Sequence, residues 1–484
     1  MKLPRHATIY AFFIALLSLF QIALGANLIV LSAIDLVCFS ALVPLTSKTF
    51  GPNDLLFLSM GLYYGTFSLI LKSIVLQPVQ LNLQVPYLTS AYLVGGFGMI
   101  FLGYLLTERT ISRHYIGTTL RTWNVFEKTY ADVDFLYRYT PPLALFALTL
   151  VLVISIFSNS TLEIVVEKQS VSSLNFLAAY IPLAQLALAM TLSLSFTQKD
   201  RMMRTIAIVI LAVALVSSLL TNHKTTMFVI GITVPLHLLA YKIRVNVRVI
   251  LGMLLGIIVT FFYATPIIHI IRTEQIDKSQ YITQIVKILN ETEFNPFAIQ
   301  KLQDKLNSTR SLDLASEIDY LAPFDLTTDR FTLLMPIDQI ARHDNRAPIG
   351  SGTYFRKEIK ELLPRAIIGE HDLQNISDEV AWRYSIRENG VIARPALGVL
   401  GTGLGIAGPL GLLLFGPLVA MMMFVVNKLV CNGSIWQNPW AVFIASYSFF
   451  RGEADFGEPT EILRGFLPML AIAYFLIFLK RHLK

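Results

Sequence analysis

The sequence predicts an all-α polytopic membrane protein with about twelve transmembrane helices and one long extracytoplasmic loop. Three observations lead to this fold class. The 484 residues are 54% hydrophobic and only 15% charged, whereas soluble domains carry roughly 25% charged residues. The mean hydropathy is +0.60. Apolar runs long enough to cross a bilayer recur along most of the chain and are interrupted by one long polar segment.

The individual spans follow from the thickness of a bilayer. Its hydrocarbon core is roughly 30 Å thick, so a crossing helix needs about 20 mostly apolar residues. The chain holds about twelve such runs, at 7–24, 27–45, 54–76, 87–106, 141–158, 174–195, 205–221, 226–241, 248–268, 400–427, 435–450 and 465–480. The first run lacks a clear small-residue cleavage site, so we interpret it as a span and not as a signal peptide.

Basic residues divide the connecting loops into two alternating sets. The rich set contains Lys48, Arg109, Arg113, Arg121, Lys128, Arg138, Lys199, Arg201, Arg204, Lys242, Arg244, Arg248, Lys428, Lys480, Arg481 and Lys484. The other short loops hold only Lys168, Lys224, Arg451 and Arg464. Because cytoplasmic loops are enriched in Lys and Arg, the rich set and both termini are expected in the cytoplasm. The net charge of +7 has the same origin and does not indicate nucleic-acid binding.

The chain therefore divides into three parts: spans one to nine at 1–268, a long extracytoplasmic loop at 269–391, and spans ten to twelve at 392–484. A loop of this length is usually functional. Apolar residues recur in it at near-helical spacing, at Ile282, Ile285 and Ile288 and again at Phe297, Ile299, Leu302 and Leu306. Their neighbours are polar or charged, so we expect amphipathic helices that lie on the membrane surface.

Basic residues are dense in the second half of the long loop and predict an anion-binding surface. They are Arg330, Arg342, Arg346, Arg356, Lys357, Lys360, Arg365, Arg383, Arg387 and Arg394. Guanidinium groups bind phosphate in a bidentate manner and keep their charge when partly buried. The alternative for each residue is a solvated surface position, paired with Asp338, Asp344, Glu358, Glu361, Asp378 or Glu379. Arg394 stands at the mouth of an apolar segment, where an unpaired charge is costly.

Candidates for a general base also lie in this loop. His343 adjoins Asp344, and a histidine titrates near neutrality, so it can take a proton from a sugar hydroxyl. Asp329, Glu379 and Glu388 are rival bases.

Ionisable residues also occur at or inside the expected spans. Lys224 lies in the short outer turn before the eighth span, at the membrane face where the long loop is expected. Asp35 and Lys72 fall inside expected spans, where a charged group often marks function. Cys38 and Cys431 lie in separate apolar regions and form no disulfide framework or metal cluster. No metal-binding or cofactor-binding motif stands out, which favours a metal-independent reaction.

The segment from Pro395 to Gly416 is apolar and rich in glycine, with Gly398, Gly401, Gly403, Gly405, Gly408 and Gly411. Two readings stay open for these glycines. They allow a ligand or a backbone to approach closely, and in membranes they also allow tight packing between helices.

The order of motifs over about 330–416 resembles that of the Wzy-type O-antigen and oligosaccharide repeat-unit polymerases. The elements are Arg330, then Gly352-Thr353-Tyr354, then Leu363-Pro364-Arg365, and then the glycine-rich segment. His223-Lys224 stands where members often have Ser-Arg. Val399 follows Gly398 where members often have an acidic residue, so no base is assigned at that position.

The resemblance implies a GT-C-like, metal-independent glycosyltransferase that uses no cofactor. It would join undecaprenyl-diphosphate-linked repeat units at the periplasmic face of the bacterial inner membrane, in O-antigen or related polysaccharide biosynthesis. The diphosphate would be held by Lys224, Arg330, Arg365, Arg387 and Arg394, with His343, Asp329 or Glu379 as the catalytic base. Gly398 and Gly405 would permit close approach of substrate or backbone. The implied partners are the lipid-linked glycan, membrane lipids and a candidate chain-length regulator, with no nucleic acid.

Two alternatives remain. An O-antigen ligase shares the architecture but transfers finished glycan to another acceptor. A lipid-linked oligosaccharide flippase or other transporter is the second. Many twelve-span transporters place their long loop between two symmetric halves, whereas here it follows the ninth span, which argues against this class.

Overall fold

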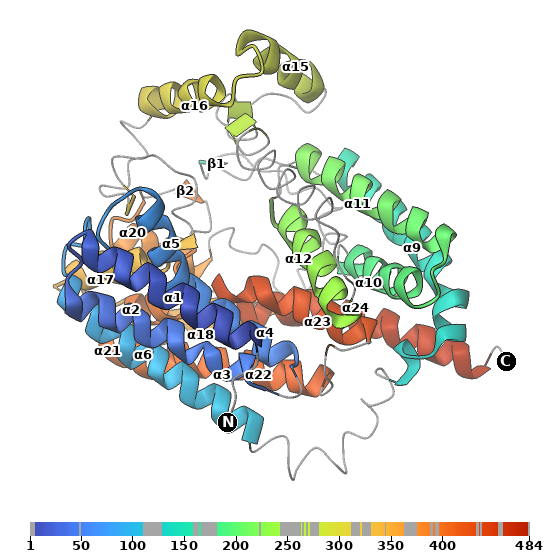
Figure 1. The fold of residues 1–484 in the computed structure, drawn as a ribbon, viewed down its shortest axis with the longest axis horizontal. Coiled ribbons are helices and arrows are strands. Elements are labelled where there is room, and N and C mark those ends of the chain that lie inside the picture. The colour runs from blue at the N-terminus through green and yellow to red at the C-terminus, as the bar shows by residue number, and fades with distance from the viewer. Residues whose placement is uncertain are drawn as a thin grey trace. The chain divides into compact units, whose positions relative to one another are not determined.

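The protein is helical in nearly all the residues that its structure describes (Figure 1). This computed structural model describes residues 5–47, 50–109, 128–157, 164–165, 182–221, 224–242, 263, 266–267, 270–271, 280–310, 320–321, 331–343, 345–362, 375–387, 391–392, 396–431, 435, 438–453 and 458–482. Within these ranges six helical stretches are long and apolar enough to cross a membrane: His6–Ala23, Leu28–Leu45, Pro52–Ile74, Pro86–Arg109, Val133–Val153 and Gly398–Val430. The prediction of a helical membrane protein is confirmed at this level.

The chain forms two compact units, each built from segments distant in sequence. The first unit comprises 1–129, 316–435 and 444–471, and the second comprises 130–315, 436–443 and 472–484. The long loop predicted at 269–391 is thus shared, since its first part belongs to the second unit and its remainder to the first. The loop was delimited by polarity, whereas these units are delimited by packing.

The first unit contains most of the described membrane helices. Its elements are α1 (Arg5–Ala23), α2 (Leu28–Ser40), α3 (Leu42–Leu45), α4 (Pro52–Gly61), η1 (Leu62–Thr66), α5 (Phe67–Ile74), α6 (Pro86–Leu106), α17 (Leu334–Arg342), α18 (Ser351–Leu362), α20 (Ile376–Arg383), β2 (Val391–Ile392), α21 (Gly398–Leu410), η7 (Gly411–Phe415), α22 (Gly416–Val430) and η8 (Phe450–Glu453). The π-helical turn η1 joins α4 and α5 into one continuous helix.

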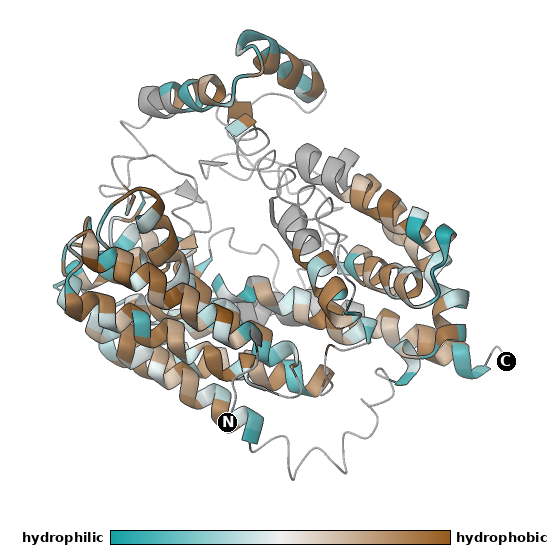
Figure 2. Ribbon diagram, viewed as in Figure 1, coloured by the Kyte–Doolittle hydropathy of each residue, from teal (hydrophilic) through white to brown (hydrophobic). Residues whose placement is uncertain are grey.

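The second unit contains β1 (Ile164–Val165), α9 (Val133–Phe157), α10 (Pro182–Thr197), α11 (Arg201–Thr221), α12 (Lys224–Ala240), α15 (Tyr281–Glu291) and α16 (Pro296–Arg310). Two further helices, α23 (Pro439–Phe449) and α24 (Glu458–His482), are divided between the units. Apolar residues cover most of the length of α1, α2, α6 and α22 (Figure 2). Large side chains such as Phe12 and Leu19 of α1 are exposed, as expected for a helix that faces lipid.

Aromatic packing and buried polar bonds hold the first unit together between α4, α6 and α22. The ring of Phe57 stacks on Tyr104 at 4.7 Å and lies 6.4 Å from Phe424. The Tyr104 hydroxyl donates to Asp54 Oδ1 at 2.5 Å, and Asp54 Oδ2 accepts from the Gly51 N–H at 2.7 Å. The carboxylate of Asp54 therefore satisfies the amino end of α4 and ties it to α6.

Candidate functional site

The glycine-rich segment is a helical hairpin and not the single span predicted at 400–427. Ala407 (φ −140°, ψ 22°) and Gly408 (φ 63°, ψ −152°) leave helical geometry between two helical arms. A Cβ atom on Gly403 would lie 2.6 Å from the carbonyl oxygen of Gly411, and one on Gly416 would lie 2.7 Å from that of Val399. Residues eight apart in a straight helix are separated by about 12 Å, so the chain must reverse direction at Gly408.

The two arms of this hairpin differ in length. The first arm, 398–406, is about 13 Å long at 1.5 Å per residue, which is too short to cross a bilayer. The second arm, 409–430, is about 33 Å long and long enough to cross. Hydropathy alone identifies both arms as one apolar run of 33 residues, because it does not show where the chain reverses direction. The first arm therefore enters the apolar region without crossing it.

Both ends of the short arm are capped by other parts of the chain. At its carboxyl end, the N–H groups of Ile349 and Gly350 donate to the carbonyls of Gly405 and Ile406 at 3.2 and 2.9 Å. At its amino end the Leu400 N–H donates to the Tyr64 hydroxyl at 3.1 Å. Unpaired backbone groups are costly in apolar surroundings, so these bonds allow a short helix to exist there.

Tight contacts at Gly398 and Gly405 are made by the protein itself. Gly398 has φ 68°, and a side chain there would run into the Tyr64 hydroxyl and Leu333. A side chain on Gly405 would run into Val380 of α20. The observed close approaches therefore correspond to the helix-packing reading of these glycines, and a role toward substrate stays a prediction.

Helix α17, from the predicted surface loop, is packed inside the first unit. Its residues Leu334, Ile337 and Ile340 are buried. The Leu333 N–H donates to the carbonyl of Tyr63 in η1 at 3.1 Å. Asp338, also fully buried, accepts from the N–H groups before α6 and from the Thr89 hydroxyl of α6, with distances of 2.7 to 3.0 Å. This part of the loop thus caps α6.

Lys72 fixes a second point of the same loop. Its ammonium group is fully buried and donates to Gln77 Oε1 at 2.8 Å, to the Leu81 carbonyl at 2.8 Å and to the Tyr320 carbonyl at 2.6 Å. It also lies 4.3 Å from the centre of the Tyr320 ring. The Tyr320 hydroxyl donates to the Val79 carbonyl at 2.7 Å, and burial raises its pKa. This charged residue inside an expected span therefore holds the loop against α5.

A cluster of basic residues lies at the carboxyl end of the short arm. The Arg346 guanidinium donates to the Arg383 carbonyl at 2.5 Å and to Ser385 Oγ at 2.8 Å, and the Arg346 N–H donates to the His343 carbonyl at 2.9 Å. Tyr384 in the same turn donates its hydroxyl to the Gly405 carbonyl at 3.4 Å. The bonds from the Arg346 guanidinium join the end of α17 to the turn after α20, and we call the basic residues of the two joined segments, Arg342, His343, Arg346, Arg383 and Arg387, the arginine cluster. The partial negative charge at a helix carboxyl end favours cations there.

The turn that carries Arg383 and Arg387 is strained and is held by several bonds. Ser385 has φ 56°, a left-handed conformation that costs roughly 1–2 kcal/mol for a residue other than glycine. The N–H groups of Ile386 and Arg387 both donate to the Ala381 carbonyl, at 2.8 and 3.3 Å. Together with Arg346, these bonds determine where Arg387 leaves the helix end.

The predicted site residues fall into three groups. His343 and Arg387 belong to the arginine cluster. Glu379, on α20, forms an ion pair with Lys357 of α18. Asp329, Arg330, Arg365 and Arg394 lie outside the described residues, and Lys224 begins α12 in the second unit, with its side chain outside the description.

Arg342, Arg346 and Arg383 were not assigned a role by sequence reasoning, although they were counted among the basic residues. Arg342 and Arg346 are four residues apart, as are Arg383 and Arg387. That spacing is a weak signal, since it predicts a shared helix face but not that the two pairs meet. The segments that carry them are joined by the hydrogen bonds from Arg346 to the Arg383 carbonyl and to Ser385 Oγ.

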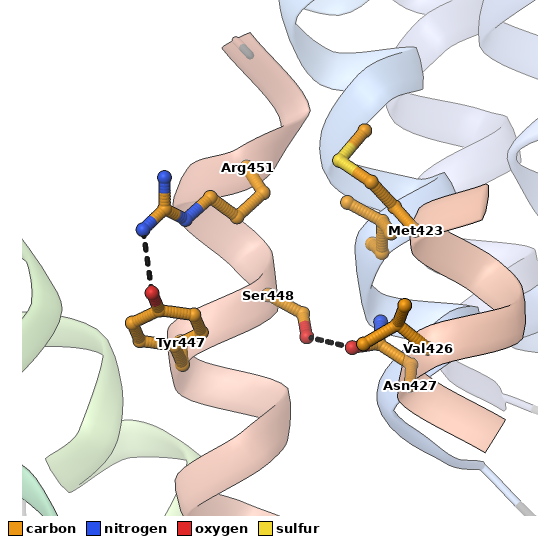
Figure 3. Close-up of a pocket in the computed structure, with 7 residues that line it drawn as sticks. Met423, Val426, Asn427, Tyr447, Ser448 and Arg451 are labelled. Atoms are coloured by element: carbon orange, nitrogen blue, oxygen red, sulfur yellow. Dashed lines mark hydrogen bonds between the residues drawn. The ribbon is translucent and has the colours of Figure 1, made fainter. Parts of the chain in front are cut away.

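A separate small pocket lies in the first unit beside α4 and α22 (Figure 3), lined by Leu56, Met423, Val426, Asn427, Tyr447, Ser448 and Arg451. Arg451 donates to the Tyr447 hydroxyl at 2.6 Å, and Ser448 donates to Asn427 Oδ1 at 3.0 Å. None of the predicted site residues lines this pocket.

The helix that carries part of this pocket is shorter than the span predicted at 435–450. Helix α23 has 11 residues, or about 16 Å at 1.5 Å per residue, and η8 follows it directly. Gly452 in η8 packs against Ser59 of α4.

Among the residues that the structure describes, no group of three or more His, Cys, Asp and Glu side chains is arranged to hold a metal ion. A scan against protein-family models, a search of curated proteins and a search of solved structures found no match for this chain.

Proposed function

We propose that this protein is a polymerase that joins lipid-diphosphate-linked oligosaccharide repeat units at the periplasmic face of a bacterial inner membrane. The observation that carries the proposal is the arginine cluster, which lies against a short glycine-rich helix among apolar helices. A lipid-linked donor has the same two parts: an anionic diphosphate and a long apolar chain. The order of motifs between Arg330 and Gly416 supports the same reading.

In this reaction the acceptor hydroxyl oxygen bonds to the anomeric carbon of the donor, and the bond from that carbon to the diphosphate oxygen breaks. Negative charge grows on the departing diphosphate. Guanidinium groups of Arg383 and Arg387 would stabilise that charge, and removal of one such preorganised donor typically lowers a rate about 10²–10³-fold. Arg346 would position both through the turn at Ser385. Arg330, Arg365, Arg394 and Lys224 stay candidate phosphate ligands.

The proton of the acceptor hydroxyl would pass to His343, the ionisable base that adjoins the cluster. His343 ends α17 and its carbonyl accepts from Arg346. Glu379 is the weaker candidate because its ion pair with Lys357 occupies a carboxylate oxygen. Asp329 stays a rival base. No resident metal or cofactor is part of this proposal.

The test is a glycan gel from a deletion strain that carries the intact gene, Arg387→Ala, Arg383→Ala or Arg356→Ala. Arg356 is the matched control, an exposed arginine of α18 outside the cluster. We expect the deletion, Arg387→Ala and Arg383→Ala to leave single repeat units on the core, and Arg356→Ala to keep the full ladder. Immunoblots of membranes would show that all variants accumulate.

The alternatives give different gels. Complete loss of glycan from the core in the deletion strain would indicate the ligase. An unchanged ladder in the deletion strain would indicate a transporter or an enzyme of another glycan. Full ladders in both Arg383→Ala and Arg387→Ala would contradict the role of the arginine cluster.

A further inference from the structure

Helices α15 and α16 expose an apolar surface that the rest of the second unit does not cover. The exposed fractions are 70% for Ile282, 50% for Val286, 60% for Phe294 and 76% for Phe297. We call these four residues the hairpin face. They differ from the residues that form the core beneath, which include Tyr281, Ile288 and Ile299. Four large exposed apolar side chains within one helix pair are more than the scattered single residues of an ordinary soluble surface.

The packing of α15 shows that its apolar side is wider than its protein contact. At about 100° per residue, Tyr281, Ile285 and Ile288 point in one direction, and Ile282 and Val286 point roughly 100° further round. The first group packs against Ile267, Ile270 and Ile271, at the end of the expected ninth span. The sequence predicted Ile282, Ile285 and Ile288 as one membrane-facing group. In the structure Ile285 and Ile288 contact other parts of the protein, whereas Ile282 is exposed.

The same helix pair is fixed to the end of that span by a hydrogen bond. The Tyr263 hydroxyl donates to the Phe294 carbonyl at 3.0 Å. Tyr263 belongs to the expected span at 248–268, so Phe294 lies within one side chain of a segment expected in the membrane. The turn between α15 and α16 therefore lies beside the end of a segment that is expected in the membrane.

The turn between the helices holds Phe294 in an unfavourable conformation. Glu293 and Phe294 have φ values of 51° and 57°, a left-handed conformation that is unfavourable for residues other than glycine. Backbone bonds from Glu293 to Asn290 and from Phe294 to Leu289, at 3.1 and 2.9 Å, maintain the turn. The Phe294 side chain gains little packing within the chain, so its compensating partner is expected outside it.

We propose that α15 and α16 form an interfacial anchor whose hairpin face inserts into the outer leaflet of the bilayer beside the ninth span. Ile282, Val286, Phe294 and Phe297 would lie at the boundary between headgroups and acyl chains. The polar side of α15, with Thr283 and Lys287, would stay in water. This inference does not depend on the reaction that the protein catalyses.

The test uses single nitroxide spin labels on the full chain in vesicles of phosphatidylethanolamine and phosphatidylglycerol. Cys38 and Cys431 are first replaced by Ala, and labels are attached to Ile282→Cys, Val286→Cys and Phe294→Cys. Matched controls on the exposed polar side are Thr283→Cys and Lys287→Cys. At the hairpin face we expect the nitroxide to collide more often with oxygen, which concentrates in lipid, than with a water-soluble nickel chelate. At the control positions we expect the nitroxide to collide more often with the nickel chelate.

Two results would overturn the proposal. If the nickel chelate dominates at all five positions, the face is in water. If neither reagent reaches the hairpin face while both reach the controls, another protein surface covers it, such as a second copy of this chain. Each labelled variant changes a single residue of the cysteine-free chain. A variant that fails to fold would also show altered nitroxide collisions at the control positions, so misfolding can be recognised.

Discussion

Single glycines in this protein serve different purposes, and the neighbours of each decide which. Gly405 is pressed against Val380, so its missing Cβ is what lets α20 lie on the short arm. Gly98 in α6 has no neighbour within 4 Å of the position a Cβ would take. The two residues are alike in sequence, since both lie in glycine-containing apolar runs, but only the first should be sensitive to substitution.

Gly405→Ala should lower stability by about 1–3 kcal/mol, because the added methyl overpacks a filled contact. Val380→Ala in the same chain should recover part of that loss, since it removes the atoms that the methyl meets. Gly98→Ala is the control and should be neutral or stabilising by about 0.5–1 kcal/mol. The measurement is the unfolding temperature of each variant in detergent. Equal sensitivity at both glycines would contradict this account.

At this scale the sequence predicted residue types better than contacts. Arginine density indicated an anion site, which stays a prediction, and His343 and Arg387 lie in two segments that Arg346 joins. The hydrogen bond from Arg346 to Ser385 could not be predicted, because nothing in the sequence indicates that a serine adopts φ 56°. The pairing of Glu379 with Lys357 depends on how α18 meets α20, which is likewise a matter of tertiary packing.

At the scale of elements, hydropathy identified where apolar helices occur but not how they run. The hairpin at Gly408 was missed because both arms are equally apolar. Helix α17 was missed as an interior element because its apolar side, with Leu334, Ile337 and Ile340, resembles that of a surface helix. The buried Asp338 is the residue that distinguishes the two cases, since a surface helix has no reason to bury a carboxylate.

Lys72→Met should loosen the long loop where it meets α5. The change removes three hydrogen bonds donated by a buried ammonium group, to the carbonyls of Leu81 and Tyr320 and to Gln77 Oε1, while the Asn82 side chain still donates to the Tyr320 carbonyl. A hydrogen bond to a charged group contributes about 1.5–3 kcal/mol. Hydrogen exchange should accelerate in peptides that contain Tyr320. The control is Lys301→Met, on the exposed side of α16, which should leave hydrogen exchange in the peptides that contain Tyr320 unchanged. Unaltered exchange in the Lys72 variant would show that the loop is held by other contacts.

At the scale of the molecule, two ion pairs join loops that the charge pattern assigns to the same side of the membrane. Within the first unit, Lys428 pairs with Glu108 at 2.8 Å. Within the second, Lys480 pairs with Asp132 at 2.5 Å. All four residues lie in or beside loops expected in the cytoplasm, so these contacts agree with the sidedness predicted from Lys and Arg counts.

The pair in the second unit makes a pH-dependent contribution. The hydrogen bond from Lys480 lowers the pKa of Asp132. A depressed carboxyl pKa contributes stability above its unfolded value, near 3.9, and the contribution is lost as pH falls through the folded value. Lys480→Met should therefore lower the unfolding temperature slightly at pH 7, because so exposed a pair contributes less than about 1 kcal/mol. The difference in unfolding temperature should shrink as pH falls below the unfolded value and vanish below the folded pKa, and a difference that stays constant would contradict this account.

The short arm of the hairpin also constrains how the protein is made. Nine residues of helix cannot be retained in a bilayer alone, and its amino end is completed by Tyr64, more than three hundred residues earlier in the chain. Its carboxyl end needs Ile349 and Gly350, which reach it from the preceding loop. The arm can therefore settle only after η1 and the preceding loop are in place. Maturation of the arginine cluster is thus a late event of biogenesis, and a nascent chain halted before Gly398 would display those arginines without the helix end that organises them.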